Sequence, residues 1–363
     1  MSSSSPAGPQ RRRPPLRPCP PLPAEDLAEI LAQTRGLWEE VRGETIFITG
    51  GTGFFGAWLL ESFTQANDRL RLGARAVVLT RDPGTFKSRM PHLAARPDLE
   101  FLAGHLTDFP FPPGRYAFVI HAANDLDPAL AERSPAGMLE TIGRGTDHLL
   151  AFVAQAGTRK LLLTSSGAVY GHQPADLERM PENYEAAPAP LSPGSAYADG
   201  KRLAEQKCLL HAGHLGSELK LARCFAFIGP HLPLNGAFAA GNFIRNALQG
   251  EPIQVRGDGT PYRSYLYAAD LAAWLWTILF RGQPGRAYNV GADQPLTVAE
   301  LAAKVARATR PESEVIIAQP AVPGSAAARY VPAIDRARTE LSLIPRISLD
   351  EAIRRTIQWY RLP

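Results

Sequence analysis

Short apolar runs alternate with amphipathic stretches along most of the chain. The apolar runs predict strands at 46–48, 76–80, 99–101, 119–121, 161–164 and 221–227. Apolar residues that recur at three- and four-residue steps predict helices at 54–65, 138–156, 196–212, 242–248, 271–280, 298–308 and 349–360. Buried strands of a parallel sheet lack a polar face and therefore read as continuous apolar runs. This alternation predicts an α/β fold in which a doubly wound parallel sheet carries helices on both faces.

The hydrophobic pattern is stronger in some stretches than in others, and this predicts that the chain has four parts. The first residues are rich in Pro, Ser and Arg and bury too little apolar surface to fold. We expect a disordered tail at 1–23 and an N-terminal helix at 24–43. A sheet domain should follow at 44–227, and a smaller, more irregular α/β lobe at 228–363. The N-terminal helix should run unbroken from 23 to 41. A helix at 268–280 and a strand near residue 288 should return from the last part to the sheet domain.

Charge and composition narrow the class of protein. The chain of 363 residues carries 39 Lys and Arg against 35 Asp and Glu, a net charge of +4. The tail contributes four positive charges, from Arg11, Arg12, Arg13 and Arg17. The rest of the chain is therefore close to neutral and lacks the basic face of a nucleic-acid binder. No apolar run reaches the ~18 residues of a membrane span, no secretory signal is recognisable, and the three cysteines fit no disulfide framework or zinc pattern. We expect a soluble, cytoplasmic protein without nucleic-acid, membrane or metal partners.

Three glycines follow the first predicted strand and open the next helix. Gly50, Gly53 and Gly56 have the spacing G-x-x-G-x-x-G, a variant of the dinucleotide-binding fingerprint. The first glycine permits a tight turn, the second lets the backbone approach a pyrophosphate, and the third lets helix and strand pack closely. Free N–H groups at the start of the helix then face the anion. Because strand, turn and helix occur in the required order, the sequence predicts a dinucleotide site.

The end of the second predicted strand should meet the adenosine ribose. It reads Thr80-Arg81-Asp82. A hydroxyl and a guanidinium there suit a 2′-phosphate, whereas Asp82 could bind the unmodified ribose of NAD. Both cofactors stay open, and Thr80 with Arg81 favours NADP. Asp108 is placed where its carboxylate could accept from the adenine amine.

A phenol and an ammonium lie four residues apart in a predicted helix. Tyr197 and Lys201 share one helix face, and a nearby ammonium favours the phenolate that can accept a proton. Ser166 ends a predicted strand, in the crevice where open α/β sheets bind ligands. Its hydroxyl could hold a substrate oxygen while Tyr197 takes the proton. Asn124, after the fourth strand, is a candidate sugar contact.

These motifs together resemble the extended short-chain dehydrogenase/reductases, and more narrowly their nucleotide-sugar epimerase/dehydratase group. The matching segments are 49–56, 166–171, Tyr197 with Lys201, 222–225, 241–244, 257–259, 263–267 and 270–271. The resemblance implies a Rossmann domain, a substrate-binding C-terminal lobe, a nicotinamide dinucleotide and hydride transfer at a carbon of a nucleotide-diphosphate sugar. It implies Ser166, Tyr197 and Lys201 as the catalytic residues, and a homodimer by analogy.

The resemblance also extends the set of expected contacts. Arg263 matches the arginine that pairs with the nucleotide diphosphate, Asn242 matches a polar residue beside it, and Ser165 joins them on the substrate side. Besides the glycines and Thr80, Arg81 and Asp108, we expect the cofactor to contact Phe54, Phe55, Leu106, Ala122, Ala123, Thr164, Tyr197 and Lys201.

Two departures from the group's pattern limit the reaction. Dehydratases of this group carry an Asp-Glu pair directly after the catalytic Ser or Thr, but here Gly167 and Ala168 stand there. Ala226 replaces an asparagine that touches the diphosphate. We therefore place epimerisation through a transient ketone first and NADPH-dependent reduction of a keto sugar second. Dehydration, decarboxylation, and a non-catalytic dinucleotide-sensing or RNA-binding role come behind them.

Overall fold

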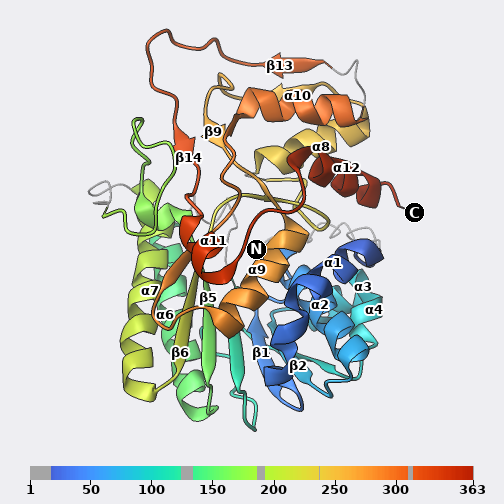
Figure 1. Ribbon diagram of the computed structural model, residues 1–363, viewed down its shortest axis with the longest axis vertical. Helices are drawn as coiled ribbons and strands as arrows, with labels where there is room; N and C mark the ends of the chain where they lie inside the picture. Colours follow the sequence, from blue (N-terminus) through green and yellow to red (C-terminus); the bar gives the residue numbers. More distant parts are fainter. Residues whose placement is uncertain (1–17, 124–133, 186–192, 237, 310–313, 363) are drawn as a thin grey trace, which may run out of the picture.

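The computed structural model describes residues 18–123, 134–185, 193–236, 238–309 and 314–362. Seven parallel strands form the central sheet in the order β11-β6-β5-β4-β1-β2-β3 (Figure 1). Their bounds are β1 Thr45–Thr49, β2 Arg75–Thr80, β3 Leu99–Ala103, β4 Phe118–His121, β5 Lys160–Ser166, β6 Glu218–Cys224 and β11 Ala287–Val290. The predicted doubly wound parallel sheet is confirmed, and the strand order reverses direction between β1 and β4.

Helices cover both faces of the sheet because its strands are apolar on both sides. On one face, Phe47 packs with α6 (Pro135–Gln155) and α7 (Ala196–Leu215). On the other, the neighbouring Ile46 and Ile48 pack with α2 (Phe54–Leu70) and α9 (Ala268–Arg281). All thirteen residues from Ala268 to Phe280 are buried, which explains why that helix has no polar stripe. Helix α9 crosses in front of the strands in Figure 1.

The segment before the sheet differs from the expected single helix. Helix α1 ends at Thr34 (Ala24–Thr34), and residues Arg35–Val41 continue as a 3₁₀ helix. Gly36 weakens the α-helix at this point, and the tighter turn carries Trp38 into the core, where its ring lies 4.7 Å from that of Trp276. Trp38 Nε1 donates to Thr34 Oγ1 at 2.9 Å.

Residues 18–23 are packed rather than disordered, which differs from the expectation for the tail. The backbone N–H of Leu22 donates to the buried carboxylate of Glu61 at 2.8 Å, and Trp359 Nε1 donates to the Pro21 carbonyl at 3.0 Å. The rest of the expected tail lies outside the described residues. Buried Asp26 extends this attachment, since it accepts from Tyr267 and pairs with Arg355.

The chain after β6 forms a smaller, more irregular part. The strand predicted at 221–227 breaks at residue 224, because Phe227–Ile228 (β7) leaves the sheet to pair with Leu266–Tyr267 (β10). The three predicted helices of this part appear as α8 Ala239–Gln249, α10 Val298–Thr309 and α12 Leu349–Tyr360. Short elements without a periodic pattern were not predicted: α3 Pro83–Arg89, α4 Pro91–Ala94, α11 Asp335–Leu341, β8 Ile253–Val255, β9 Tyr262–Arg263, β12 Leu296–Thr297, β13 Val315–Ile317 and β14 Arg329–Tyr330.

The remaining expectations concern the membrane and the homodimer. Among the described residues, no helix combines the length and apolarity that crossing a membrane requires. Helix α7 exposes Leu203, Leu209 and Leu210 beside its neighbour α6, and the homodimer stays a prediction.

Candidate active site

A cleft of about 730 Å³ opens at the carboxyl ends of β1, β4 and β5. This is the point where the strand order reverses, and open α/β sheets bind ligands there. The opposite wall comes from the C-terminal part of the chain, through residues such as Arg263, Tyr265 and Tyr330. The cleft therefore lies between the sheet and the more irregular part, so that a ligand in it would touch both.

The glycine turn has the geometry that a dinucleotide pyrophosphate requires. Gly50 has a φ of 72°, and a Cβ there would come within 2.4 Å of the Ala122 backbone. A Cβ on Gly56 would come within 2.2 Å of Gly51, so this glycine lets α2 pack closely against the turn that precedes it, and it does not line the cleft. At Gly53, which caps α2 and lines the cleft, a Cβ would meet only the Gly50 carbonyl oxygen at 3.5 Å. The space in front of Gly53 is thus left to a ligand, and the turn fits the cofactor.

The residues expected around the rest of the cofactor divide into two groups. Those that line the cleft are Phe54, Phe55, Thr80, Arg81, Leu106, Ala122, Ala123 and Thr164. Asp108 is exposed and lies outside this lining, so its contact with adenine stays a prediction. Asp82 is occupied as the N-cap of α3, where it accepts from the backbone and hydroxyl of Thr85 at 2.9 and 2.5 Å. These hydrogen bonds lower the pKa of Asp82.

The structure brings the three candidate catalytic residues to one side of the cleft. Ser166 is the last residue of β5, and Tyr197 and Lys201 lie one turn apart at the start of α7. The buried ammonium of Lys201 donates to the Thr164 carbonyl at 3.1 Å and lies 6.0 Å from the centre of the Tyr197 ring. Ser166 Oγ accepts from the Ala168 N–H at 3.1 Å. A substrate oxygen in the cleft could therefore meet a serine hydroxyl and a phenol together.

Tyr330 is a site residue that the sequence analysis missed. Its hydroxyl lies 3.4 Å from Ser166 Oγ, and loss of hydration raises the pKa of this phenol. Strand β14 pairs with β9 so that Tyr330 stands beside Arg263. A two-residue strand in a stretch without periodicity gives no pattern from which this placement could have been predicted.

The expected substrate contacts are only partly assembled. Arg263 and Ser165 line the cleft, and the buried Ser165 Oγ has no hydrogen-bond partner within the described parts of the chain. Asn242 does not line the cleft; its amide donates to the Gly236 carbonyl at 2.9 Å. Asn124 lies outside the described residues. The roles of these four residues stay predictions.

The structure explains why residue 167 is a glycine, which the sequence alone did not reveal. A Cβ at this position would come within 2.7 Å of the Phe225 ring, so the space that a longer side chain would need is filled. Ala168 and Ala226 both line the cleft. The two positions that carry Asp and Glu in dehydratases, 167 and 168, thus have no carboxylate here. At residue 167 the Phe225 ring also leaves no room for one.

The cleft is cationic. Its lining contains Arg81, Lys201 and Arg263 but, as far as the described residues go, no Asp or Glu. His121 adds no charge, because burial and the neighbouring Lys201 lower its pKa to about 3. This electrostatic environment suits ligands with several negative charges, such as a dinucleotide and a nucleotide diphosphate.

Acidification should destabilise the protein through His121, whose Nδ1 lies 2.8 Å from Thr49 Oγ1. Its pKa of about 3 in the folded state lies below its ordinary 6.5, so the unfolded chain binds the proton first and stability falls below pH 6.5. Between pH 7.5 and 5.5 this group should remove about 1.4 kcal/mol. Urea unfolding at both pH values should show that His121→Gln loses less stability than the wild type by this amount. Equal losses would show that His121 is not held neutral.

The fold and the cleft define a Rossmann-type dinucleotide-binding protein. Residues 46–291 match the model of the NAD dependent epimerase/dehydratase family. Because the match covers more than half of the chain, this protein belongs to that family, as the resemblance implied.

Curated relatives and solved structures resemble this chain over most of its length. UDP-glucuronic acid decarboxylase 6 of Arabidopsis thaliana is 27% identical over 353 residues, 97% of this chain and 95% of that protein. A dTDP-glucose 4,6-dehydratase of Streptomyces niveus is 26% identical, over 87% of this chain and 92% of that protein. The crystal structure of UDP-glucose 4-epimerase from Thermotoga maritima with UDP-glucose aligns with a TM-score of 0.72 at 22% identity, over 87% of this chain and 98% of that one. The structural likeness shows the shared fold.

Proposed function

We propose that this protein oxidises a ring hydroxyl of a nucleoside-diphosphate sugar to a ketone and reduces the sugar again within the same turnover. One observation carries the proposal: Ser166, Tyr197 and Lys201 line the same cleft as a glycine turn that fits a dinucleotide. A sugar bound in this cleft would therefore lie between the proton-transfer residues and the cofactor site.

Each of these residues has a defined task in the proposed reaction. A bound nicotinamide dinucleotide would supply the hydride acceptor and donor for this reaction. Gly50, Gly53 and the first N–H groups of α2 would hold its pyrophosphate. Tyr197 removes the hydroxyl proton, with the ammonium of Lys201 stabilising the phenolate. Ser166 donates to the reacting oxygen and keeps it in line with Tyr197.

The charge of the cleft and the relatives favour decarboxylation of a uronic acid as the particular reaction. Once the hydroxyl next to the carboxylate-bearing carbon is a ketone, the sugar is a β-keto acid. The C–C bond to the carboxylate breaks, CO₂ leaves, and the electron pair moves into the carbonyl, where Ser166 and Tyr197 stabilise the enolate. A proton from water restores the carbon before reduction. No protein carboxylate is needed, and arginines suit the extra negative charge. Decarboxylases among the relatives move this reaction ahead of the expected epimerisation.

Epimerisation is the second candidate, because it also needs only proton and hydride transfer at one carbon. Dehydration is disfavoured by Gly167 and Ala168. Net reduction of a keto sugar would consume one NADPH in each turnover, so it differs from both candidates in its cofactor balance.

A panel of sugar nucleotides separates these reactions. We expect the purified protein with NAD or NADP to convert UDP-glucuronic acid, with release of CO₂ and without net change in cofactor absorbance. UDP-glucose converted to its C4 epimer would favour epimerisation instead. Conversion of dTDP-glucose to a keto-deoxy sugar would support dehydration, and turnover of none of these compounds would contradict the proposal.

Arg81 should set a preference for NADP over NAD. Asp82 is held by Thr85, so the guanidinium rather than a carboxylate lines the ribose end of the cleft. A charge-assisted hydrogen bond to the 2′-phosphate contributes about 1.5–3 kcal/mol, so Arg81→Ala should weaken NADP roughly 10- to 100-fold and NAD by less than about twofold. Fluorescence titration measures both. Arg75→Ala, at the other end of β2, is the control. An equal loss for both cofactors would contradict this role.

A further inference from the structure

A buried ion pair lies behind the candidate catalytic residues, on the side away from the cleft. Arg223 of β6 and Glu205 of α7 form three hydrogen bonds of 2.7, 3.0 and 3.3 Å. Glu205 is 9% exposed. Burial by itself would lower the pKa of Arg223, but the hydrogen bonds and the charge of Glu205 raise it above its ordinary value. The guanidinium of Arg223 is therefore charged, and the three hydrogen bonds fix its orientation against Glu205.

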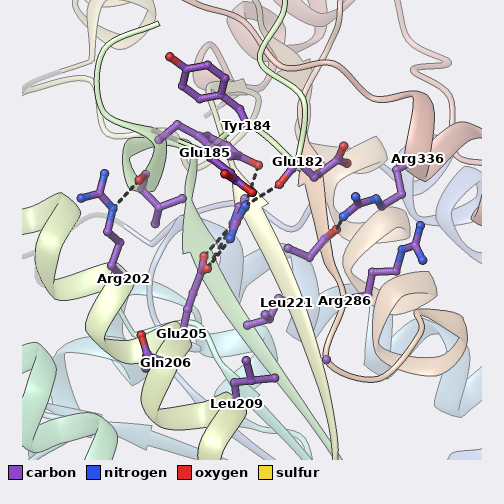
Figure 2. A pocket seen from close by; sticks show the side chains of 15 residues that line it. Glu182, Tyr184, Glu185, Arg202, Glu205, Gln206, Leu209, Leu221, Arg286 and Arg336 are labelled. Carbon is purple, nitrogen blue, oxygen red and sulfur yellow. Dashed lines mark hydrogen bonds and ion pairs between the residues drawn. The ribbon is translucent and has the colours of Figure 1, made fainter. Parts of the chain in front are cut away.

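The ion pair continues into a hydrogen-bond network that reaches Tyr170, the last residue of the 3₁₀ turn that follows Ser166. Arg223 also donates to the hydroxyl of Tyr170 at 3.0 Å, and Tyr170 donates to Asn289 at 2.8 Å. Burial raises the pKa of Tyr170 to about 12, so this phenol keeps its proton. We call Glu205, Arg223, Tyr170 and Asn289 the brace. Arg223 and Glu205 both line a second cleft, of about 530 Å³, and Figure 2 shows Glu205 at one wall of it.

The brace joins the two elements that carry the candidate catalytic residues. Glu205 follows Lys201 by one turn on α7, so it fixes the rotation of that helix. Tyr170 ends the 3₁₀ turn Gly167–Tyr170 that begins directly after Ser166. Arg223 lies between them on β6, directly beside Ser165 of β5 and Asn289 of β11 in the sheet register. Arg202 adds a parallel link from α7, since its Nε donates to the Val169 carbonyl at 2.5 Å.

The brace also reaches the third hydroxyl of the site. The Asn289 amide donates to the carbonyls of Met180 and Ala333 at 2.8 and 3.0 Å. Ala333 follows β14, the strand that places Tyr330 beside Ser166. One network thus holds the three segments that carry Ser166, the Tyr197–Lys201 pair and Tyr330.

We infer that Glu205 and Arg223 are positioning residues that set the distance between Ser166 and the Tyr197–Lys201 pair through Tyr170 and α7. Neither of them lines the cleft, so they act through the residues that do. This inference rests on the proposed function. A displacement of reacting groups by about 1 Å can cost on the order of a hundredfold in rate, so loosening the brace should lower kcat while leaving binding intact.

The test compares Glu205→Gln and Arg223→Lys with a matched ion-pair variant on the same helix. Lys207→Met breaks the exposed pair with Asp147, whose shorter distance is 2.5 Å, without touching the brace. We expect both brace variants to lose kcat at least about tenfold, with KM and cofactor affinity within about twofold of the wild type. Lys207→Met should keep the wild-type values. Unchanged kcat in the brace variants, or an equal loss in Lys207→Met, would overturn the inference.

Two further measurements keep the outcome clear if a brace variant folds poorly or the substrate is misassigned. Tyr170→Phe keeps the ion pair and removes the hydrogen bonds of the Tyr170 hydroxyl with Arg223 and Asn289, so it should fold and still lower kcat. Full activity in this variant would overturn the inference. Hydrogen exchange needs no turnover. In Glu205→Gln it should rise in 166–171 and 196–206 and stay unchanged in β1 and β2. A uniform rise across the sheet would mean a purely structural role, whereas absence of wild-type turnover with a local rise would refute only the proposed reaction.

Discussion

Tyr197→Phe should abolish turnover while the protein stays folded and binds its cofactor. Removal of a general base lowers rates by about 10²- to 10⁴-fold, and the loss should fall on kcat because the ring remains in place. Phe keeps the apolar contacts of the tyrosine ring in the cleft. Single-turnover kinetics with UDP-glucuronic acid and titration with NAD and NADP measure the two effects separately.

A second tyrosine provides the control for this variant. Tyr116 is buried at the opposite end of the sheet, where its hydroxyl donates to the Pro113 carbonyl at 3.4 Å. Tyr116→Phe should retain wild-type kcat. Full activity in Tyr197→Phe would remove this residue from the catalytic role, and loss of cofactor binding together with activity would show that it acts in binding instead.

Gly50→Ala should cost the protein both stability and its cofactor. The position has a φ of 72°, which costs an L-residue about 1–2 kcal/mol. The added methyl would also lie 2.4 Å from the Ala122 backbone, so β1 and β4 would have to separate. Together these effects should lower the free energy of unfolding by about 3 kcal/mol or more, measured by urea denaturation.

Gly73 separates the two contributions. Its φ is 62°, yet a Cβ there would have no neighbour within 4 Å. Gly73→Ala should therefore show only the backbone cost of about 1–2 kcal/mol, with normal binding of NAD or NADP. Equal losses in the two variants would mean that the contact with Ala122 relaxes without cost and that Gly50 is needed only for its conformation.

The sequence was sufficient for the sheet and for the residues that regular elements carry. Gly50, Ser166, Tyr197 and Lys201 lie at strand ends or on a helix, where spacing fixes their relative positions. Spacing says less about Asp108, which lies in the loop after β3 and is exposed, so its contact with adenine stays a prediction. Periodicity reports which face of an element is buried, and it does not report the path of a loop.

Contacts between segments that are distant in the sequence could not be predicted from residue spacing. Tyr330 meets Ser166 only because a two-residue strand pairs with β9, and nothing local marks that pairing. The Phe225 ring that excludes a side chain at Gly167 is another example, as is the brace from Glu205 to Tyr170. Each depends on the packing of the second part of the chain against the sheet, which tertiary structure alone determines.

A deuterium label shows whether the hydride removed from the sugar returns to the same carbon. A sugar nucleotide that the protein converts would carry deuterium on the carbon of the hydroxyl to be oxidised, and the product would be examined by mass spectrometry and NMR. The account predicts that deuterium remains at that carbon, that turnover slows in the labelled substrate, and that no reduced cofactor accumulates. Conversion with loss of the label to water, or with stoichiometric accumulation of reduced or oxidised cofactor, would contradict a hydride that is taken and returned within one cleft.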